Sequence, residues 1–292
     1  MNRRRAAEAA LVWNTIVWGA TFVVVKAALR DVSPALFLAL RFSVATGALL
    51  AIFHKPAWAA FSWKAVGAGA IAGAFLFSGY LFQTIGLRLT TAPRSAFITG
   101  LTSVAVPLLA ALVYGIRPRV SEVVGVVVAT AGLALMTLPG VVGAMSLGDL
   151  LTVLCALGFA AHIVTLGHFT GQLSYQLLAV TQIAVAAVLG WAFAWVEQPH
   201  VAWRPAVVWA ILVTGLLATA LAFSIQAWAQ RYTSSTRTAL IFMLEPVVAW
   251  ITSYCMEGEG LSGRAAAGAA LILGGVVMVE LKPLNPRPHQ FQ

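Results

Sequence analysis

Long apolar runs constrain this chain more than any other feature of its sequence. Between Leu11 and Ala28 the only charged residue is Lys26, and between Pro34 and Phe53 it is Arg41. Each run is close to the roughly 20 residues that an α-helix needs to cross ~30 Å of hydrocarbon. The pattern therefore predicts an all-α membrane protein without a separate soluble core.

Charged residues are too sparse to cover a water-soluble surface. They make up 9% of the 292 residues, and apolar residues make up 61%, whereas a soluble domain has roughly 25% charged residues. Charges, prolines and glycines divide the chain into ten predicted transmembrane helices joined by short connections. The predicted spans are 8–28, 33–53, 65–88, 92–114, 120–138, 148–168, 176–196, 205–229, 235–256 and 262–281.

The net charge of +9 does not indicate a nucleic-acid-binding protein. The only basic run, Arg3-Arg4-Arg5, directly precedes an apolar segment, and the other Lys and Arg residues are scattered. Basic residues at the ends of membrane helices report orientation instead. Cys155 and Cys255 lie inside apolar segments without Cys-x-x-Cys spacing, so we interpret them as packing residues and expect neither a metal site nor a disulfide.

The distribution of Lys and Arg predicts the orientation, because cytoplasmic loops are enriched in these residues. With the N-terminus in the cytoplasm, eleven of them fall inside and six outside, and Arg41 lies within a span. The inside set is Arg3, Arg4, Arg5, Lys55, Lys64, Arg117, Arg119, Arg231, Arg237, Lys282 and Arg287, and the outside set is Lys26, Arg30, Arg88, Arg94, Arg204 and Arg264. With an even number of spans, both termini are then predicted to be cytoplasmic.

The two halves of the chain resemble each other. With an offset of 143 residues, Gln83–Leu101 aligns with Gln226–Leu244, and seven of the nineteen positions are identical. Further matches at nearly the same offset pair Gly125 with Gly268, Gly132 with Gly275, and Trp18–Thr21 with Phe159–His162. This order predicts a duplication, with one five-helix repeat in residues 1–140 and a second in residues 141–292.

A repeat of five spans has a consequence for topology. Because five is odd, the second copy enters the membrane from the opposite side, and the two copies form an inverted repeat. Inverted repeats that rock about a central site are a recurring plan of secondary transporters. The alternative is a duplicated membrane scaffold without a transport path.

Several short motifs resemble a known family. They are Trp18-Gly19-x-x-Phe22, Arg41, Arg94-x-Ala96-x-Ile98, Gly132, Glu245-Pro246 and Gly275. With them the chain resembles the drug/metabolite transporter superfamily and, within it, the EamA-type exporters, most closely the aromatic and neutral amino-acid exporters known as YddG. The resemblance covers residues 8 to 281. It implies a central cavity between the repeats, lined by spans one, three, four, six, eight and nine, alternating access, and a place in a bacterial inner membrane.

Four charged residues within or near spans are candidates for structural or coupling roles, because such side chains usually face the bundle interior or a water-filled cavity. Glu245 is interpreted as a proton or cation site, or as a hydrogen-bonded brace beside the Pro246 kink, and the brace is favoured. Arg41 either binds a carboxylate or pairs structurally with another helix, and pairing is favoured. Arg94 and Arg237, at equivalent repeat positions near helix starts, are predicted to be gates or loop anchors.

Polar stripes on three helices are candidates for the substrate cavity. They are Asn14, Trp18 and Thr21 in the first span, Tyr80, Gln83 and Thr84 in the third, and Ser95, Thr99 and Thr102 in the fourth. Gln226 is the repeat counterpart of Gln83, and His162 overlies Thr21. The same groups can instead form hydrogen bonds between helices, or, for His162, a packing contact. The sequence leaves these alternatives open.

Deep aromatic residues indicate what kind of substrate such a cavity would take. Trp18, Tyr80 and Trp228, with Met243 and the polar stripes, predict an apolar and aromatic pocket with a few polar groups. Because the spans contain no cluster of basic residues, the pocket suits neutral amphiphilic metabolites better than polyanions.

The sequence therefore predicts an exporter of aromatic or neutral amino acids, or of similar small metabolites. The expected partners are this substrate and the lipid bilayer, with coupling to protons or ions left open. Alternatives are a drug, sugar or nucleoside carrier of the same superfamily, or a non-transporting membrane scaffold. The sequence has no Walker, His-Glu-x-x-His, Gly-x-Ser-x-Gly or dinucleotide motif, so we expect neither an enzyme nor a cofactor.

Overall fold

The computed structural model of the chain describes residues 3–90, 92–137, 145–257 and 262–280. Regular structure in this part is helical, apart from one antiparallel bridge between Val32 and Val201. The helices are α1 (Arg3–Ala28), α2 (Pro34–Ala59), α3 (Trp63–Leu89), α4 (Ala92–Gly100), α5 (Thr102–Tyr114), α6 (Val120–Thr137), α7 (Leu147–Thr170), α8 (Tyr175–Glu197), α9 (Pro205–Gly215), the π-helix η2 (Leu216–Leu221), α10 (Ala222–Ala229), α11 (Ser235–Phe242), α12 (Glu245–Glu257) and α13 (Gly263–Glu280).

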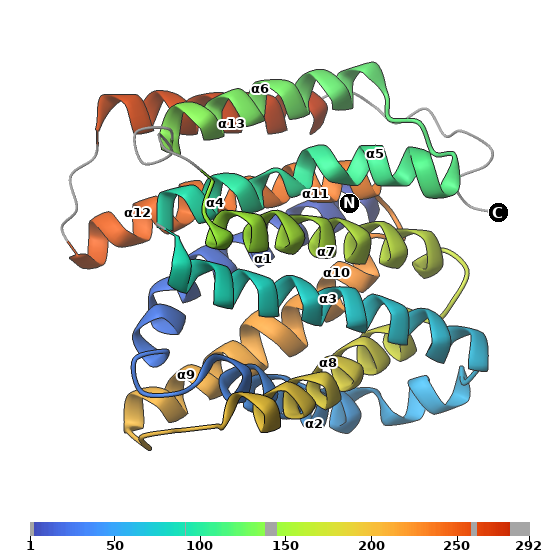
Figure 1. Ribbon diagram of the computed structural model, residues 1–292. Coiled ribbons are helices and arrows are strands. Elements are labelled where there is room, and N and C mark those ends of the chain that lie inside the picture. Colours follow the sequence, from blue (N-terminus) through green and yellow to red (C-terminus); the bar gives the residue numbers. More distant parts are fainter. Residues whose placement is uncertain (1–2, 91, 138–144, 258–261, 281–292) are drawn as a thin grey trace.

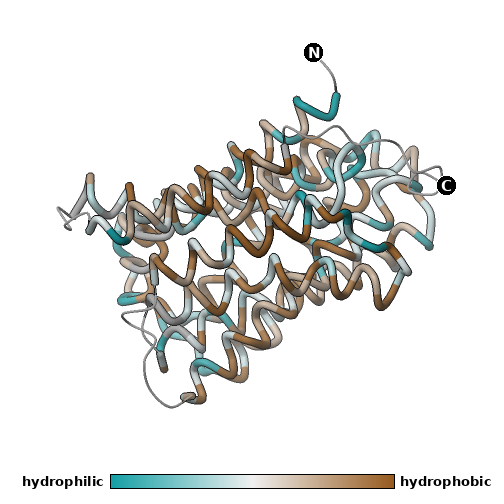
Figure 2. Tube along the Cα trace, turned by 90° about the horizontal axis from the view of Figure 1, so that it is seen from above, coloured by the Kyte–Doolittle hydropathy of each residue, from teal (hydrophilic) through white to brown (hydrophobic). Residues whose placement is uncertain are grey.

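The helices run across the molecule in stacked layers (Figure 1). The pair α6 and α13 forms one edge, α2, α8 and α9 form the opposite edge, and α3 and α7 lie between them. Helix α1 begins and α13 ends toward the same side of the molecule. Hydrophilic residues gather toward the helix ends, and the middle of the helices is mostly apolar (Figure 2). This is the distribution expected for helices that cross a bilayer.

Seven helical segments of the described chain are long and apolar enough to cross a membrane. They are Pro34–Ala59, Trp63–Gly86, Ser95–Tyr114, Val120–Thr137, Leu147–Thr170, Tyr175–Glu197 and Pro205–Ala229. The all-helical fold class is thus confirmed for these residues, and the count of ten spans stays a prediction.

Three predicted spans are interrupted, although the sequence pattern predicted one continuous helix for each. The span 92–114 consists of α4 and α5, the span 205–229 contains η2, and the span 235–256 consists of α11 and α12. In the last of these, Pro246 occupies the second position of α12, where its missing N–H interrupts no helical hydrogen bond. The chain therefore restarts a helix at the proline, and no kinked helix passes through it.

Glycines bring helices α6 and α13 into backbone contact. A Cβ atom built on Gly132 would lie 2.6 Å from the Gly268 carbonyl oxygen, and one on Gly275 would lie 2.7 Å from the Gly125 carbonyl oxygen. Small residues allow membrane helices to approach this closely, and van der Waals packing then holds the pair together. The two helices pack as one unit at the edge of the bundle.

Candidate functional site

The candidate site begins at the buried guanidinium of Arg41. Arg41 lies in α2 and is 4% exposed. Its Nε donates to the Thr219 hydroxyl (2.6 Å), and its Nη2 donates to the Ala218 carbonyl and to the Tyr80 hydroxyl (3.2 Å each). All three acceptors are neutral. Within the described residues Arg41 therefore pairs with helix dipoles and hydroxyl groups and has no carboxylate partner in hydrogen-bond contact.

Aromatic rings from five other helices form a continuous series of contacts that begins at this guanidinium. Its Cζ lies 4.8 Å from the centroid of the Tyr80 ring, which is a cation–π distance. The Tyr80 ring contacts Phe159 of α7 (5.2 Å) and Phe223 of α10 (6.4 Å), and Phe223 contacts Trp18 of α1 (5.4 Å). Trp18 also packs against Phe242 of α11 (4.8 Å).

Seven residues thus form one group, which we call the central cluster. Its members are Trp18, Arg41, Tyr80, Phe159, Thr219, Phe223 and Phe242. They come from α1, α2, α3, α7, η2, α10 and α11. The predicted candidates Trp18, Tyr80 and Arg41 are therefore brought together, although they are separated in the chain.

The π-helix η2 supplies the polar partners of Arg41. In this segment the Thr219 hydroxyl donates to the carbonyl of Thr214, five residues earlier (2.8 Å). A π-turn inserts one residue into a helix and is frequently found at functional sites. It lies in the middle of the segment from α9 to α10, so Thr219 and the Ala218 carbonyl face the Arg41 side chain at depth.

Two of the cavity candidates attach α1 to this interrupted helix, which is the alternative of a hydrogen bond between helices that the sequence left open. The Trp18 Nε1 donates to the Ala218 carbonyl (2.8 Å), and the Asn14 Nδ2 donates to the Ala222 carbonyl (2.7 Å). Asn14 is fully buried, whereas Trp18 is half-buried. Asn14 is thus in a helix–helix hydrogen bond, while the Trp18 ring also reaches the central cluster.

Glu245 opens helix α12 close to this cluster, and its side chain is half-buried. Among the described residues its carboxylate has no hydrogen bond and no ion pair. The structure therefore gives no support to the brace interpretation that the sequence favoured. Phe242, three residues before Glu245, packs against Trp18 (4.8 Å), which places the start of α12 beside the central cluster.

The remaining polar stripes mostly bond within their own helices. The Thr21 hydroxyl donates to the Val17 carbonyl (2.8 Å), and the Thr84 hydroxyl donates to the Tyr80 carbonyl (2.7 Å). Thr99 lies 3.9 Å from the Cys155 sulfur. The three other stripe residues are Ser95, which is buried, Gln83, which is half-buried, and Thr102, whose hydroxyl donates to the Thr99 carbonyl (2.6 Å) and to the Ala156 carbonyl of α7 (3.3 Å). The hydroxyl groups of Thr21 and Thr84 are already satisfied by the backbone, so they offer little to a solute.

His162 and Gln226 belong to a buried network beside the central cluster. His162 Nε2 lies 2.8 Å from Gln182 Oε1, and the imidazole packs edge-on against Phe223 (5.7 Å). Gln226 donates to Gln230 (3.2 Å), which in turn donates to a carbonyl of α7. The candidate Met243 is buried in a separate apolar cluster with α6 and α13. His162 thus supports Phe223 and is 2% exposed itself.

Arg237 is held in a buried ionic cluster where α1, α6 and α11 begin. It is 0% exposed; its Nη1 lies 3.3 Å from the Glu8 carboxylate, and its Nε lies 3.7 Å from the Glu122 carboxylate. Arg4 also donates to Glu8 (2.6 Å), and Ser234 donates to Glu122 (2.8 Å). A buried charge of this kind persists only when it is paired. Arg237 therefore ties together the starts of three helices.

A second polar contact between the two halves of the chain lies at the start of α7. The Thr90 hydroxyl donates to the Asp149 carboxylate (2.5 Å), and Asp149 forms a capping box with Ser146 at the start of α7. Ser235, next to the Arg237 cluster, contacts α7 near its far end, at the Ile163 carbonyl (3.4 Å). The side chain of Arg94, the repeat counterpart of Arg237, lies outside the described residues.

Comparison with known proteins identifies the family. The model of the EamA-like transporter family matches residues 6–138 and residues 146–281, which together are most of the chain. The chain belongs to the EamA-like transporter family. This EamA-like chain is therefore a multi-pass membrane transporter, and the predicted superfamily is confirmed.

The relatives of this EamA-like transporter are transporters without an assigned solute. An uncharacterized transporter of Archaeoglobus fulgidus is 34% identical over 96% of this chain and 87% of its own length. The uncharacterized transporter YoaV of Bacillus subtilis is 21% identical over 90% of this chain and 93% of its own length. A solved structure described as "Crystal structure of protein" has a TM-score of 0.80 at 19% identity, covering 95% of this chain and 97% of that one, and so shares the fold.

Sequence reasoning missed four members of the site in this EamA-like transporter. Thr219 and Phe223 lie in a continuous apolar run, where nothing local separates them from lipid-facing residues, and Phe242 precedes the helix break. Phe159 carried a usable signal, because it is the repeat counterpart of Trp18. In the structure Trp18 contacts Phe223, and Phe159 contacts Tyr80.

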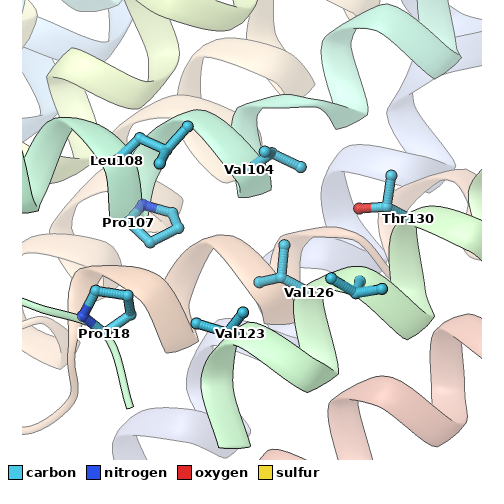
Figure 3. A pocket seen from close by; sticks show the side chains of 8 residues that line it. Val104, Pro107, Leu108, Pro118, Val123, Val126 and Thr130 are labelled. Atoms are coloured by element: carbon cyan, nitrogen blue, oxygen red, sulfur yellow. The ribbon is translucent and has the colours of Figure 1, made fainter. Parts of the chain in front are cut away.

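A separate hollow lies away from the site, between α5 and α6. Its volume is about 270 Å³. Figure 3 shows Val104, Pro107 and Leu108 of α5 facing Val123, Val126 and Thr130 of α6 across it. Its lining is almost entirely apolar and contains none of the predicted cavity residues, so it is not part of the candidate site.

Proposed function

We propose that this EamA-like transporter exports aromatic or other neutral amino acids across the bacterial inner membrane. The proposal rests on the central cluster, in which a guanidinium with only neutral hydrogen-bond partners lies against Tyr80, the first of a series of contacting aromatic rings. Rings from five helices suit an apolar or aromatic side chain, and a guanidinium is the group that best recognises a carboxylate. An amino acid offers both features in one small molecule.

The transport mechanism that we propose is alternating access between two inverted repeats, residues 1–140 and 141–292. Equivalent contacts in the two repeats support it. Thr90 donates to Asp149 (2.5 Å), and Thr233 donates to Glu8 (3.4 Å). In the repeat alignment Thr233 is the counterpart of Thr90, and Glu8 is the counterpart of Asp149. Each contact joins one half of the chain to the other. The glycines of α6 and α13 exchange in the same way, since Gly125 meets Gly275 and Gly132 meets Gly268.

Release of solutes from proteoliposomes tests the proposed function. The purified protein is reconstituted with a mixed internal panel of amino acids, sugars and nucleosides, and protein-free liposomes serve as the control. We expect selective loss of phenylalanine, tryptophan and other neutral amino acids. Selective loss of the sugars or nucleosides would instead assign another solute class, and retention of the whole panel by a folded, inserted protein would reject the proposal.

A further inference from the structure

Two opposite charges lie in the region of the central cluster without forming an ion pair with each other. Arg41 donates only to neutral acceptors, and the Glu245 carboxylate has no hydrogen-bond partner among the described residues. Phe242, three residues before Glu245, packs against Trp18 of the central cluster (4.8 Å), so the start of α12 lies beside the cluster that contains Arg41. Charged side chains inside a membrane are expensive, and those present are usually paired or functional. The separation of this pair therefore indicates a third group that binds between them.

The Arg41 guanidinium retains donors that its protein contacts do not use. Guanidinium groups carry five N–H donors in a rigid plane. The bonds to Thr219, Ala218 and Tyr80 use Nε and Nη2, which leaves the two N–H groups of Nη1. Because three bonds fix the plane, these donors have a defined direction. They can bind a carboxylate without dissolving the contacts that hold Arg41 in place.

Glu245 has the complementary properties. It is half-buried and lies in the first turn of α12, where the positive end of the helix dipole stabilises a carboxylate. Its nearest neighbours along the chain are Leu244, Pro246 and Val247, so the segment offers it no cationic partner. An ammonium group that entered the site would supply one.

We propose that Arg41 and Glu245 form a two-charge subsite that binds the zwitterionic backbone of an α-amino acid. The Arg41 guanidinium takes the carboxylate, the Glu245 carboxylate takes the ammonium group, and the rings of Trp18, Phe223 and Phe242 contact the side chain. The subsite rests on the proposed function and deepens it, because it requires both charges of the substrate. A solute with one of the two charges satisfies one residue and leaves the other unpaired in the membrane.

Competition among three matched solutes tests the subsite with the unmodified protein. The solutes are phenylalanine, 3-phenylpropionate, which lacks the ammonium group, and phenethylamine, which lacks the carboxylate. Unlabelled solute is added to proteoliposomes that export labelled phenylalanine. We expect phenylalanine to compete at a concentration about tenfold or more below either analogue, because each lost charge-assisted hydrogen bond is worth roughly tenfold or more in affinity. Equal competition by all three solutes would overturn the subsite.

Single substitutions then assign each charge to its residue. In Glu245→Gln the advantage of phenylalanine over 3-phenylpropionate should disappear, while its advantage over phenethylamine remains. Arg41→Gln should show the opposite pattern, and Thr252→Val in α12 should keep both advantages. If Glu245→Gln lowers export of all solutes by the same factor, Glu245 acts in coupling or folding and the subsite is rejected. Export of sugars or nucleosides in place of phenylalanine by the unmodified protein would instead reject the proposed function itself.

Discussion

At the residue scale, Thr219 is the contact on which the position of Arg41 depends most. Its hydroxyl accepts the shortest of the three Arg41 bonds, at 2.6 Å. Thr219→Val keeps the shape of the side chain and leaves the buried Nε without an acceptor, which should lower the free energy of unfolding by about 1–3 kcal/mol. Thr252→Val is the matched control, because that hydroxyl bonds only its own helix at Val248. Unfolding of both variants is followed in the same detergent by tryptophan fluorescence, and equal losses would contradict this role of Thr219.

Trp18 makes both ring contacts and a hydrogen bond, and one substitution can remove the hydrogen bond while keeping a ring. Trp18→Phe keeps an aromatic ring near Phe223 and Phe242 and removes the bond from Nε1 to the Ala218 carbonyl. Loss of one such bond should reduce the free energy of unfolding by about 0.5–1.5 kcal/mol. The exposed Trp209 provides the control, since Trp209→Phe removes no described bond. A Trp18→Phe protein as stable as the control variant would show that the bond contributes nothing.

At the element scale, the contact between α6 and α13 depends on glycine. A Cβ atom on Gly268 would lie 2.5 Å from the Gly132 carbonyl oxygen, whereas one on Gly274 in the same helix would meet nothing within 4 Å. Gly268→Ala should therefore destabilise the protein by about 1–3 kcal/mol through overpacking. Gly274→Ala should be neutral or stabilise it by up to about 1 kcal/mol, because alanine favours the helix. Comparable thermal unfolding of the two variants would argue against backbone contact between these helices.

The helical segments were predictable from the sequence, because apolar length is a local signal. The breaks within the spans 92–114, 205–229 and 235–256 were not predictable. Apolar length located α2, α3 and α8 because each run is bounded by charges or prolines. The segment that forms the π-helix η2 contains no charged residue and no proline. Its widened turn accompanies contacts with Trp18 and Arg41, which lie roughly 180 to 200 residues away in the chain. Long-range partners of this kind are invisible to periodicity.

The candidate site shows the same division between local and long-range information. A charge in an apolar run is conspicuous, so Arg41 and Glu245 stand out in the sequence alone. Their relation to each other was not predictable, since it depends on how α2 packs against η2 and how α12 packs against α1. For Asn14 and Thr84 the sequence left cavity lining and hydrogen bonding between helices as alternatives, and in the structure both side chains bond to backbone carbonyls, Asn14 to another helix and Thr84 within its own. Composition shows that a polar group is present, but only packing shows what it faces.

At the scale of the whole molecule, the predicted orientation can be tested with two exposed positions. Arg117 follows α5, and His200 lies in the connection between α8 and α9. With both native cysteines replaced by serine, Arg117→Cys should react with a membrane-impermeant maleimide only from the cytoplasm, and His200→Cys only from the outside. Sided vesicles of both orientations give the two measurements. Labelling of both positions from one side would contradict the orientation predicted from Lys and Arg.

Alternating access also predicts that a covalent cross-link at either of the two contacts between the repeats stops transport. Thr90 meets Asp149 and Thr233 meets Glu8, and α7 separates the two contacts along its length. In a protein without native cysteines, a short thiol cross-linker joins either Thr90→Cys to Asp149→Cys or Thr233→Cys to Glu8→Cys. Rocking of the halves requires each contact to part once in a cycle, so either cross-link should lower phenylalanine export at least about tenfold, and cleaving a reducible linker should restore it. A cross-linked protein that exports at the rate of its reduced form would show that the halves do not separate at these contacts.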